Sequence, residues 1–173
     1  MSSKIIFFIL SLASIISTSH QASEIVTQSC EKIPHKDLCL SALGSAPESD
    51  VHDLPGLTKF ALKMASLNGT ELYKKTAELY QTSSDEFVKQ CLTDCSEVYQ
   101  DAIDQLEDSM VAIDSKVYDD VTTWVTAAVT DTQSCEDGFK EKQGFTSPLS
   151  QDNAVFSQLC SIALSLSNLL AQQ

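Results

Sequence analysis

The sequence contains no arginine and only three histidines, and these shortages exclude several kinds of partner. Across 173 residues, 11 lysines stand against 24 acidic residues, which gives a formal net charge of −13. Nucleic acids and anionic membranes both bind clustered positive charge, so we expect neither as a partner. A neutral or basic protein partner fits better, and an acidic surface that serves only solubility is the alternative.

Catalytic and metal-binding signatures are missing as well. The sequence has no Gly-x-Ser-x-Gly, no glycine-rich phosphate loop, no His-Glu-x-x-His and none of the Glu-x-x-His pairs of di-iron bundles. His20, His35 and His52 lie near the N-terminus or in a polar linker, where no rigid scaffold positions a general base. Adjacent acids such as Asp119 and Asp120 point to different sides of a helix. We therefore expect no enzyme, no metal and no cofactor.

Residues 1–23 have the pattern of a secretory signal peptide. Lys4 precedes the apolar run IIFFILSLASIIS, and small and polar residues follow it. The run has about 13 residues where roughly 20 are needed to span a bilayer, and no later segment is expected to span one either. The mature chain is predicted to begin at residue 24, and without Lys4 it is one unit more negative.

All six cysteines follow this leader, which predicts an oxidising compartment and a disulfide framework. Six cysteines allow 15 pairings, and spacing alone does not choose among them. The only glycosylation sequon is Asn68-Gly69-Thr70, so Asn68 is a candidate for modification on the secretory route.

The clearest amphipathic helix covers residues 91–113. Its apolar and sulfur side chains recur at three- and four-residue spacing, which places them on one buried stripe. Ser83 and Glu86 just before it have the spacing of a capping box. Acidic residues with the same periodicity form a second stripe along one flank, namely Asp94, Glu97, Asp101, Asp104 and Asp108.

Three more long helices are expected around it. One covers residues 55–83, with Leu57, Met64 and Leu67 on its buried face and Gly69 weakening its middle. Another follows a break at residues 114–115, with Val117 starting its buried face, and runs to residue 135. Glycine and proline predict a loop over residues 136–150, and the last helix covers residues 151–170.

Two short helical stretches are expected over residues 24–46. They are separated by Pro34, which disfavours helix at the residue before it, and Gly44 can end the second. The sequence therefore predicts an all-α fold, an up-down-up-down four-helix bundle over residues 53–172 with an N-terminal helical hairpin, stapled by disulfides. In such a bundle Cys135 lies level with Cys95 and almost equally with Cys91, so either pairing is open.

Four motifs then occur in order. They are Cys30-x8-Cys39 around Pro34, Cys95-Ser-Glu-Val-Tyr99 followed by DAIDQL, Cys135-Glu-Asp-Gly-Phe139, and a C-terminal LSNLL. Together they resemble the plant family of invertase inhibitors and pectin methylesterase inhibitors over essentially the whole mature chain, so residues 24–173 are predicted to form one such inhibitor domain. The resemblance implies the bridges Cys30–Cys39 and Cys95–Cys135.

The resemblance also implies a function. Family members are non-catalytic, secreted proteins that cover the active-site cleft of a carbohydrate-active enzyme in the apoplast or cell wall. A monomer in a 1:1 complex is expected, and a vacuolar location is possible for an invertase inhibitor. A helical carrier of an apolar ligand is the remote alternative. It would need a cavity, which a sequence does not reveal.

Two target enzymes compete. Cell-wall invertase inhibitors of the family carry a Pro-Lys-Phe segment after the break between the second and third bundle helices, where this chain has Ser115-Lys116-Val117. The CSEVYQDAID stretch is more similar to pectin methylesterase inhibitors, so pectin methylesterase is the expected target and acid invertase the alternative. The expected contacts are the acidic stripe and the start of the third bundle helix, namely Lys116, Tyr118, Asp119, Thr122 and Thr123.

Cys91 and Cys160 remain outside the implied bridges. Both fall on core faces at similar depth in helices that lie diagonally across the bundle, and an even cysteine count in a secreted chain favours pairing. A diagonal is the longest crossing, however, and a disulfide needs Cα atoms within about 7 Å. A third bridge and two separate buried thiols both stay open.

Overall fold

The computed structural model of the chain describes residues 23–173, so the predicted signal peptide lies outside the described residues except for Ser23. The described part contains six helices and no strand, which confirms the all-α prediction. Their bounds are α1 (Glu24–Cys30), α2 (Lys36–Leu43), α3 (Leu54–Thr82), α4 (Glu86–Asp114), α5 (Tyr118–Lys140) and α6 (Ser150–Ala171).

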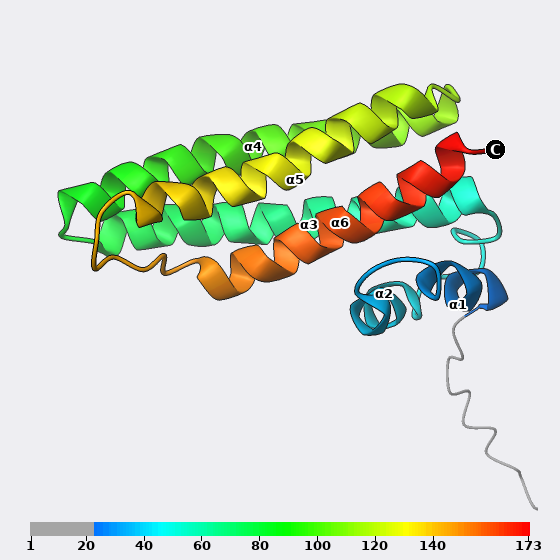
Figure 1. Cartoon of the computed structure of the whole chain (residues 1–173), viewed down its shortest axis with the longest axis horizontal. Coiled ribbons are helices and arrows are strands. Elements are labelled where there is room, and N and C mark those ends of the chain that lie inside the picture. Colours follow the sequence, from blue (N-terminus) through cyan, green and yellow to red (C-terminus); the bar gives the residue numbers. More distant parts are fainter. Residues whose placement is uncertain (1–22) are drawn as a thin grey trace, which may run out of the picture.

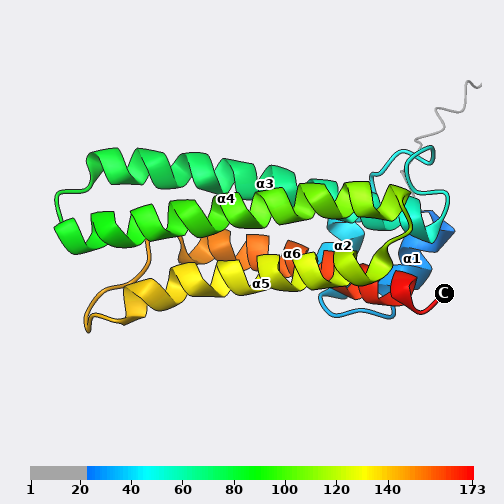
Figure 2. The same cartoon turned by 90° about the horizontal axis from the view of Figure 1, so that it is seen from above.

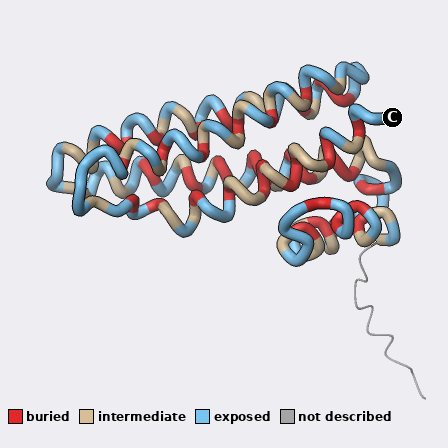
Figure 3. Tube along the Cα trace, viewed as in Figure 1, coloured by how far each residue is buried: buried red, intermediate tan, exposed pale blue. Residues whose placement is uncertain are grey.

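The four long helices form the predicted up-down-up-down bundle (Figures 1 and 2). α3 packs on α4, α4 on α5, α5 on α6, and α6 on α3, which closes the ring. The short α1–α2 hairpin lies beside one end of the bundle, where it contacts α3 and α6 (Figure 1). Buried residues line the interior of the bundle except at the end where α3 meets α4, since none of residues 77–90 is buried (Figure 3).

α3 begins at a strong N-terminal cap. The carboxylate of Asp53 accepts a hydrogen bond from the Gly56 backbone N–H at 2.8 Å, and Pro55 occupies the first turn. Leu57 is buried as predicted, but Leu67 is 53% exposed, so its placement on the core face was wrong. The buried stripe passes through Ala65 and the small residues beside it, which let the neighbouring helices approach closely.

Gly69 belongs to this close contact and is buried. A Cβ atom there would stand 2.7 Å from Phe156 Cζ and 3.1 Å from Ile103 Cγ1. The missing side chain at Gly69 therefore lets α6 and α4 pack closely against α3. Its main effect is therefore on packing between helices, whereas the sequence suggested only a weakened α3.

Replacing Gly69 by alanine is expected to lower the free energy of unfolding by about 1 kcal/mol. Alanine favours helix by about 1 kcal/mol, but overpacking against the fully buried Phe156 ring costs about 1–3 kcal/mol and prevails. Gly138→Ala is the matched control, because a Cβ on that helical glycine meets nothing within 4 Å and should stabilise the protein. Urea unfolding of both variants tests this, and a Gly69→Ala variant as stable as the wild type would contradict it.

α4 begins differently from the prediction. Asp85, and not Ser83, is its N-cap, because the Asp85 carboxylate accepts hydrogen bonds from the N–H groups of Phe87 and Val88 at 2.9 and 3.1 Å. A capping box at Ser83 is therefore wrong. The predicted buried stripe is present, with these side chains in the core: Cys91, Cys95, Tyr99, Ala102, Leu106 and Ile113.

α5 extends beyond its predicted end and starts after its predicted first core residue. The helix runs to Lys140, so the expected loop over residues 136–150 is shorter, because Phe139 continues the apolar stripe one turn beyond Cys135 and is buried. Val117 precedes the helix in the connecting turn and is 43% exposed, so its assignment to the buried face was wrong.

α6 is long and apolar enough to cross a membrane by length and composition, although no such segment was expected after the leader. Its apolar positions include Phe156, Ile162 and Leu166, and these three side chains are buried within the bundle. This composition therefore fits a core helix.

Two disulfides staple the fold, and they are the pairs that the resemblance implied. Cys30–Cys39 closes the hairpin with Cα atoms 5.6 Å apart, and Cys95–Cys135 joins α4 to α5 with Cα atoms 4.6 Å apart. Cys91 and Cys160 are buried free thiols, so the structure contains no third bridge between them. Burial raises the pKa of both thiols, which keeps them protonated and unreactive in the folded protein.

Candidate functional site

The acidic stripe is the first candidate surface. Asp94, Glu97, Asp101, Asp104 and Asp108 are all exposed on α4. Because they recur every three or four residues beside the buried stripe, their side chains lie along one exposed flank of the helix. This face has no compensating cation in the described part of the chain, since none of the five carboxylates forms an ion pair there.

The second candidate is the turn between α4 and α5. The Lys116 N–H donates to Ile113 O and the Val117 N–H donates to Ala112 O, both at 3.0 Å, the two bonds of a Schellman motif. Lys116 itself has φ of 60°, the left-handed conformation for which this position normally uses glycine. An exposed lysine thus occupies a backbone site that disfavours side chains, a pattern found at functional positions.

Two apolar residues close to this lysine in the sequence are exposed. Val111 is 66% exposed and Val117 is 43% exposed, two of the few large hydrophobic residues that the described chain leaves in solvent. Tyr118 and Thr122 are half-buried, while Asp119 and Thr123 are exposed on the first turns of α5. The turn therefore presents an exposed cation next in sequence to an exposed aliphatic residue.

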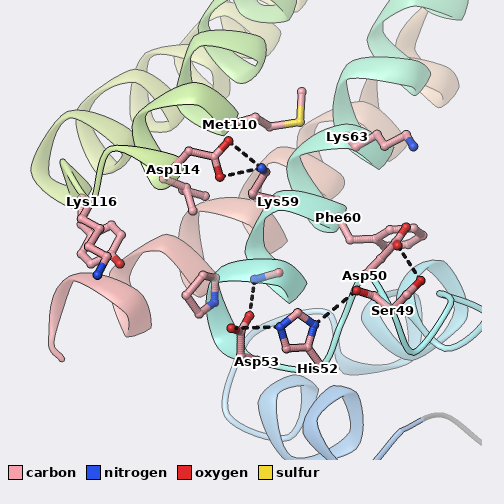
Figure 4. Close-up of a pocket in the computed structure, with 14 residues that line it drawn as sticks. Ser49, Asp50, His52, Asp53, Lys59, Phe60, Lys63, Met110, Asp114 and Lys116 are labelled. Carbon is pink, nitrogen blue, oxygen red and sulfur yellow. Dashed lines mark hydrogen bonds and ion pairs between the residues drawn. The ribbon is translucent and has the colours of Figure 1, made fainter.

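A groove of about 560 Å³ opens beside the turn (Figure 4). The polar linker before α3, the first turns of α3, the end of α4 and the turn itself all contribute to it. Lys59 bridges two of these elements, because its Nζ lies 2.7 and 2.8 Å from the carboxylate oxygens of Asp114 (Figure 4). Sequence reasoning missed this groove, since the linker showed no signal beyond its polar composition.

The structure brings together only some of the predicted contact residues. Lys116 and Tyr118 both line the groove. Asp94, by contrast, lies near the opposite end of α4, roughly 30 Å away at 1.5 Å per residue. The five carboxylates therefore form a strip along α4, Lys116 lies in the turn, and the other four predicted residues lie on the first turns of α5.

One carboxyl group at the α4–α5 contact is electrostatically unusual. Asp131 on α5 is half-buried, and its Oδ2 is buried without a hydrogen-bond partner. Burial raises the pKa of Asp131, and the nearby Asp101 carboxylate raises it further, while a hydrogen bond from Gln105 lowers it. The folded state therefore holds the Asp131 proton more tightly than the unfolded chain.

This shift predicts a pH dependence of stability. Because the folded pKa lies above the unfolded one, Asp131 destabilises the protein at neutral pH, and this effect is relieved as pH falls through the folded pKa toward about 4, the ordinary aspartate value. Asp131→Asn should therefore be more stable than the wild type at pH 7 and lose that advantage near pH 4. Thermal melts across this range test it. A stability difference independent of pH would contradict it.

No group of histidine, cysteine, aspartate and glutamate side chains in residues 23–173 could hold a metal ion. Asn68 of the sequon lies half-buried within α3, and its Oδ1 is buried without a donor, so its glycosylation remains a prediction.

The chain is similar to several known proteins. The family model described as plant invertase/pectin methylesterase inhibitor matches residues 24–166. A pectinesterase inhibitor from Actinidia deliciosa is 34% identical over 169 residues, covering 96% of this chain and 89% of that protein. A Platanus acerifolia protein, provisionally named an invertase inhibitor, is 32% identical over 155 residues, covering 86% and 87%.

Among solved structures, the fold is similar to a mutant form of a pectin methylesterase inhibitor from Arabidopsis. The TM-score is 0.72 at 24% identity, and the match covers 85% of this chain and 97% of that one. At this identity the likeness concerns the fold alone.

Proposed function

Since this chain belongs to the plant invertase/pectin methylesterase inhibitor family, we propose that it is a secreted, non-catalytic inhibitor whose target is pectin methylesterase. The observation that carries the proposal is the family match over residues 24–166, supported by relatives that are named as inhibitors. A protein partner that is an enzyme follows from the family. Loss of esterase activity in proportion to added inhibitor tests the proposal.

The contact surface is proposed to be the strip along α4 together with the first turns of α5. Five exposed carboxylates give the strip negative charge along α4. The turn at its end adds the exposed apolar residue Val117. The strip belongs to helices that pack against each other in the bundle, and a preformed surface reduces the entropic cost of association. The target cleft that fits it carries basic side chains along its rim.

Charge reversal tests the strip. Asp101→Lys with Asp104→Lys is expected to weaken binding to pectin methylesterase about tenfold, mainly through slower association, because exposed charges steer encounter. Glu48→Lys with Glu78→Lys is the matched control, since both are exposed, make the same change in net charge and lie off the strip. Association rates by surface plasmon resonance distinguish them, and equal rates for the two double variants would contradict the proposal.

Acid invertase is the second candidate target. The observation that favours it is the α4–α5 turn, where Lys116 is exposed in a left-handed conformation and the next residue, Val117, is exposed as well. The resemblance implies that the Pro-Lys-Phe segment of invertase inhibitors, which matches Ser115-Lys116-Val117 here, enters the substrate cleft of invertase. Here the flanking proline and phenylalanine are replaced by Ser115 and Val117, which favours the esterase.

The remaining proposals concern processing and assembly. Residues 1–23 are proposed to act as the signal peptide and residues 24–173 as one inhibitor domain, consisting of a hairpin over 24–46 and a bundle over 53–172. The protein is proposed to act outside the cell, in the cell wall, as a monomer in a 1:1 complex, with no role for nucleic acid or membrane. An invertase target would also allow the vacuole.

A further inference from the structure

The sequon Asn68-Gly69-Thr70 is a motif that the proposed inhibitor function does not explain. It lies within α3, at the seam where α6 packs on that helix (Figure 1). Asn68 lines a small cleft of about 100 Å³ in this seam, with Glu71 and Lys75 of α3 on one wall and Asp152 of α6 on the other. An ion pair between Lys75 and Asp152 joins the two walls.

The Asn68 side chain turns its amide nitrogen toward solvent. Its Oδ1 is buried and has no hydrogen-bond partner, whereas Nδ2, which forms no hydrogen bond within residues 23–173, remains accessible. Nδ2 is the atom that carries the sugar in an N-linked glycan. Because the cleft outside it is bordered by the exposed residues Glu71 and Lys75, the folded protein accommodates a sugar there.

The folded chain does not, however, present the sequon to a modifying enzyme. Sequons are used where the chain is accessible and irregular, whereas residues 68–70 are helical and the Thr70 hydroxyl donates to Ser66 O at 2.9 Å. Gly69 is buried, and a Cβ atom there would stand 2.7 Å from Phe156 Cζ of α6. Transfer of a sugar must therefore precede the packing of α6 on α3.

The order of synthesis provides the time for this transfer. Asp152 and Phe156, the α6 residues at the seam, are synthesised about 80 residues after the sequon. At about 5–20 residues per second, the sequon precedes its packing partner by roughly 4–16 s. A chain that enters the secretory route from its N-terminus therefore exposes the sequon before α6 exists.

We propose that Asn68 carries an N-linked oligosaccharide, transferred from a polyprenyl diphosphate donor before α6 packs on α3. In the transfer, Nδ2 forms a bond to the anomeric carbon of the first sugar while the bond from that carbon to the diphosphate breaks. Polyprenyl diphosphate leaves, and one proton of Nδ2 passes to a base of the transferring enzyme. The proposal rests on the proposed secretory route and does not depend on which enzyme is inhibited.

The oligosaccharide covers exposed apolar side chains on both helices of the seam. Leu67 is 53% exposed and lies one turn from Glu71, and Val155 is 39% exposed and lies one turn from Asp152. A bulky, polar glycan over the seam shields these side chains from other molecules.

The glycan also lies away from the proposed contact strip. In the ring of four helices, the seam between α3 and α6 is opposite the seam between α4 and α5, where the strip lies. The oligosaccharide therefore leaves the strip free to bind the target enzyme.

Mass spectrometry of the protein secreted by plant cells that express the full chain tests the modification. We expect an oligosaccharide on the peptide that contains Asn68, and peptide N-glycosidase should remove it and convert Asn68 to aspartate. Thr70→Ala should abolish the modification and aggregate at lower concentration, whereas Thr70→Ser, the matched control, keeps the sequon and should retain both properties. Secreted wild type with an unmodified Asn68 would overturn the proposal and leave the inhibitor function standing. A chain that is not secreted would overturn the secretory route and the glycan together.

Binding measurements test the position of the glycan. Enzymatic removal of the oligosaccharide should change the dissociation constant for the inhibited enzyme less than about twofold, because the glycan lies outside the contact. Asp120→Asn is the control, since it creates a second sequon that ends at Thr122 on the proposed contact surface. A glycan there, verified by mass spectrometry, should weaken binding more than about tenfold through steric exclusion. An equally large change on removing the glycan of Asn68 would overturn its placement away from the contact.

Discussion

Replacing both Cys95 and Cys135 by alanine is expected to lower the free energy of unfolding by about 4 kcal/mol. The bridge closes a loop with a sequence separation of 40 residues, and the chain-entropy model assigns such a loop about 4 kcal/mol at 25 °C. The bond joins α4 to α5, the two helices on which the proposed contact strip lies. Loss of this bond should also lower the temperature at which the protein begins to unfold.

The second disulfide provides the comparison. Cys30–Cys39 spans only nine residues of the hairpin, so its removal by alanine should cost about 2.5 kcal/mol by the same model and leave the bundle folded. Chemical denaturation measures both. Titration of the unfolded, unreduced wild type should find two thiols, those of Cys91 and Cys160. A loss below about 1 kcal/mol for the Cys95/Cys135 variant would contradict the prediction.

Tyr99→Phe is expected to lower the free energy of unfolding by about 2 kcal/mol. The fully buried Tyr99 hydroxyl lies 2.9 Å from Asn153 Oδ1 and 2.9 Å from Cys135 Sγ, and it donates to the amide oxygen, the stronger acceptor. Asn153 in turn donates from Nδ2 to Thr132 O at 2.8 Å. One hydroxyl thus connects α4, α5 and α6 inside the core.

The cost arises because the substitution leaves a buried acceptor without a donor, which typically costs about 1–3 kcal/mol. The ring of Tyr99 stays, so its edge-to-face contact with Phe156 at 5.9 Å is retained. Tyr80→Phe is the control, because Tyr80 is 40% exposed and the change should stay within about 0.5 kcal/mol. Equal stability of the two variants in urea would show that the buried hydrogen bond contributes nothing.

Helical periodicity was sufficient to predict the fold. The four bundle helices, their order and the hairpin before them follow from apolar spacing, proline and glycine, because a helix with one apolar stripe must bury it against others. The prediction of which residues face the core was less accurate. Leu67 and Val117 were assigned to the core because they are large and apolar, whereas close packing at Gly69 and the Schellman turn at Lys116 decide which residues face inward.

The candidate site, like the fold, could be predicted only in part from the sequence. Exposure of the acidic stripe was predictable, because five acids at helical spacing on one side of a buried stripe must lie outside. The groove was not predictable, because it is formed by Lys63 on α3, Met110 on α4 and the linker over residues 49–53, which only the folded chain brings together. The left-handed backbone of Lys116 is likewise a tertiary property, since sequence alone favours glycine there.

The most direct test of the account is inhibition of purified pectin methylesterase and purified acid invertase, measured side by side with the mature protein. The account predicts loss of esterase activity in proportion to the inhibitor added, with full inhibition near one inhibitor per enzyme, and little effect on invertase. Strong inhibition of invertase with unchanged esterase activity would contradict the target assignment. Unchanged activity of both enzymes would contradict the inhibitor function itself.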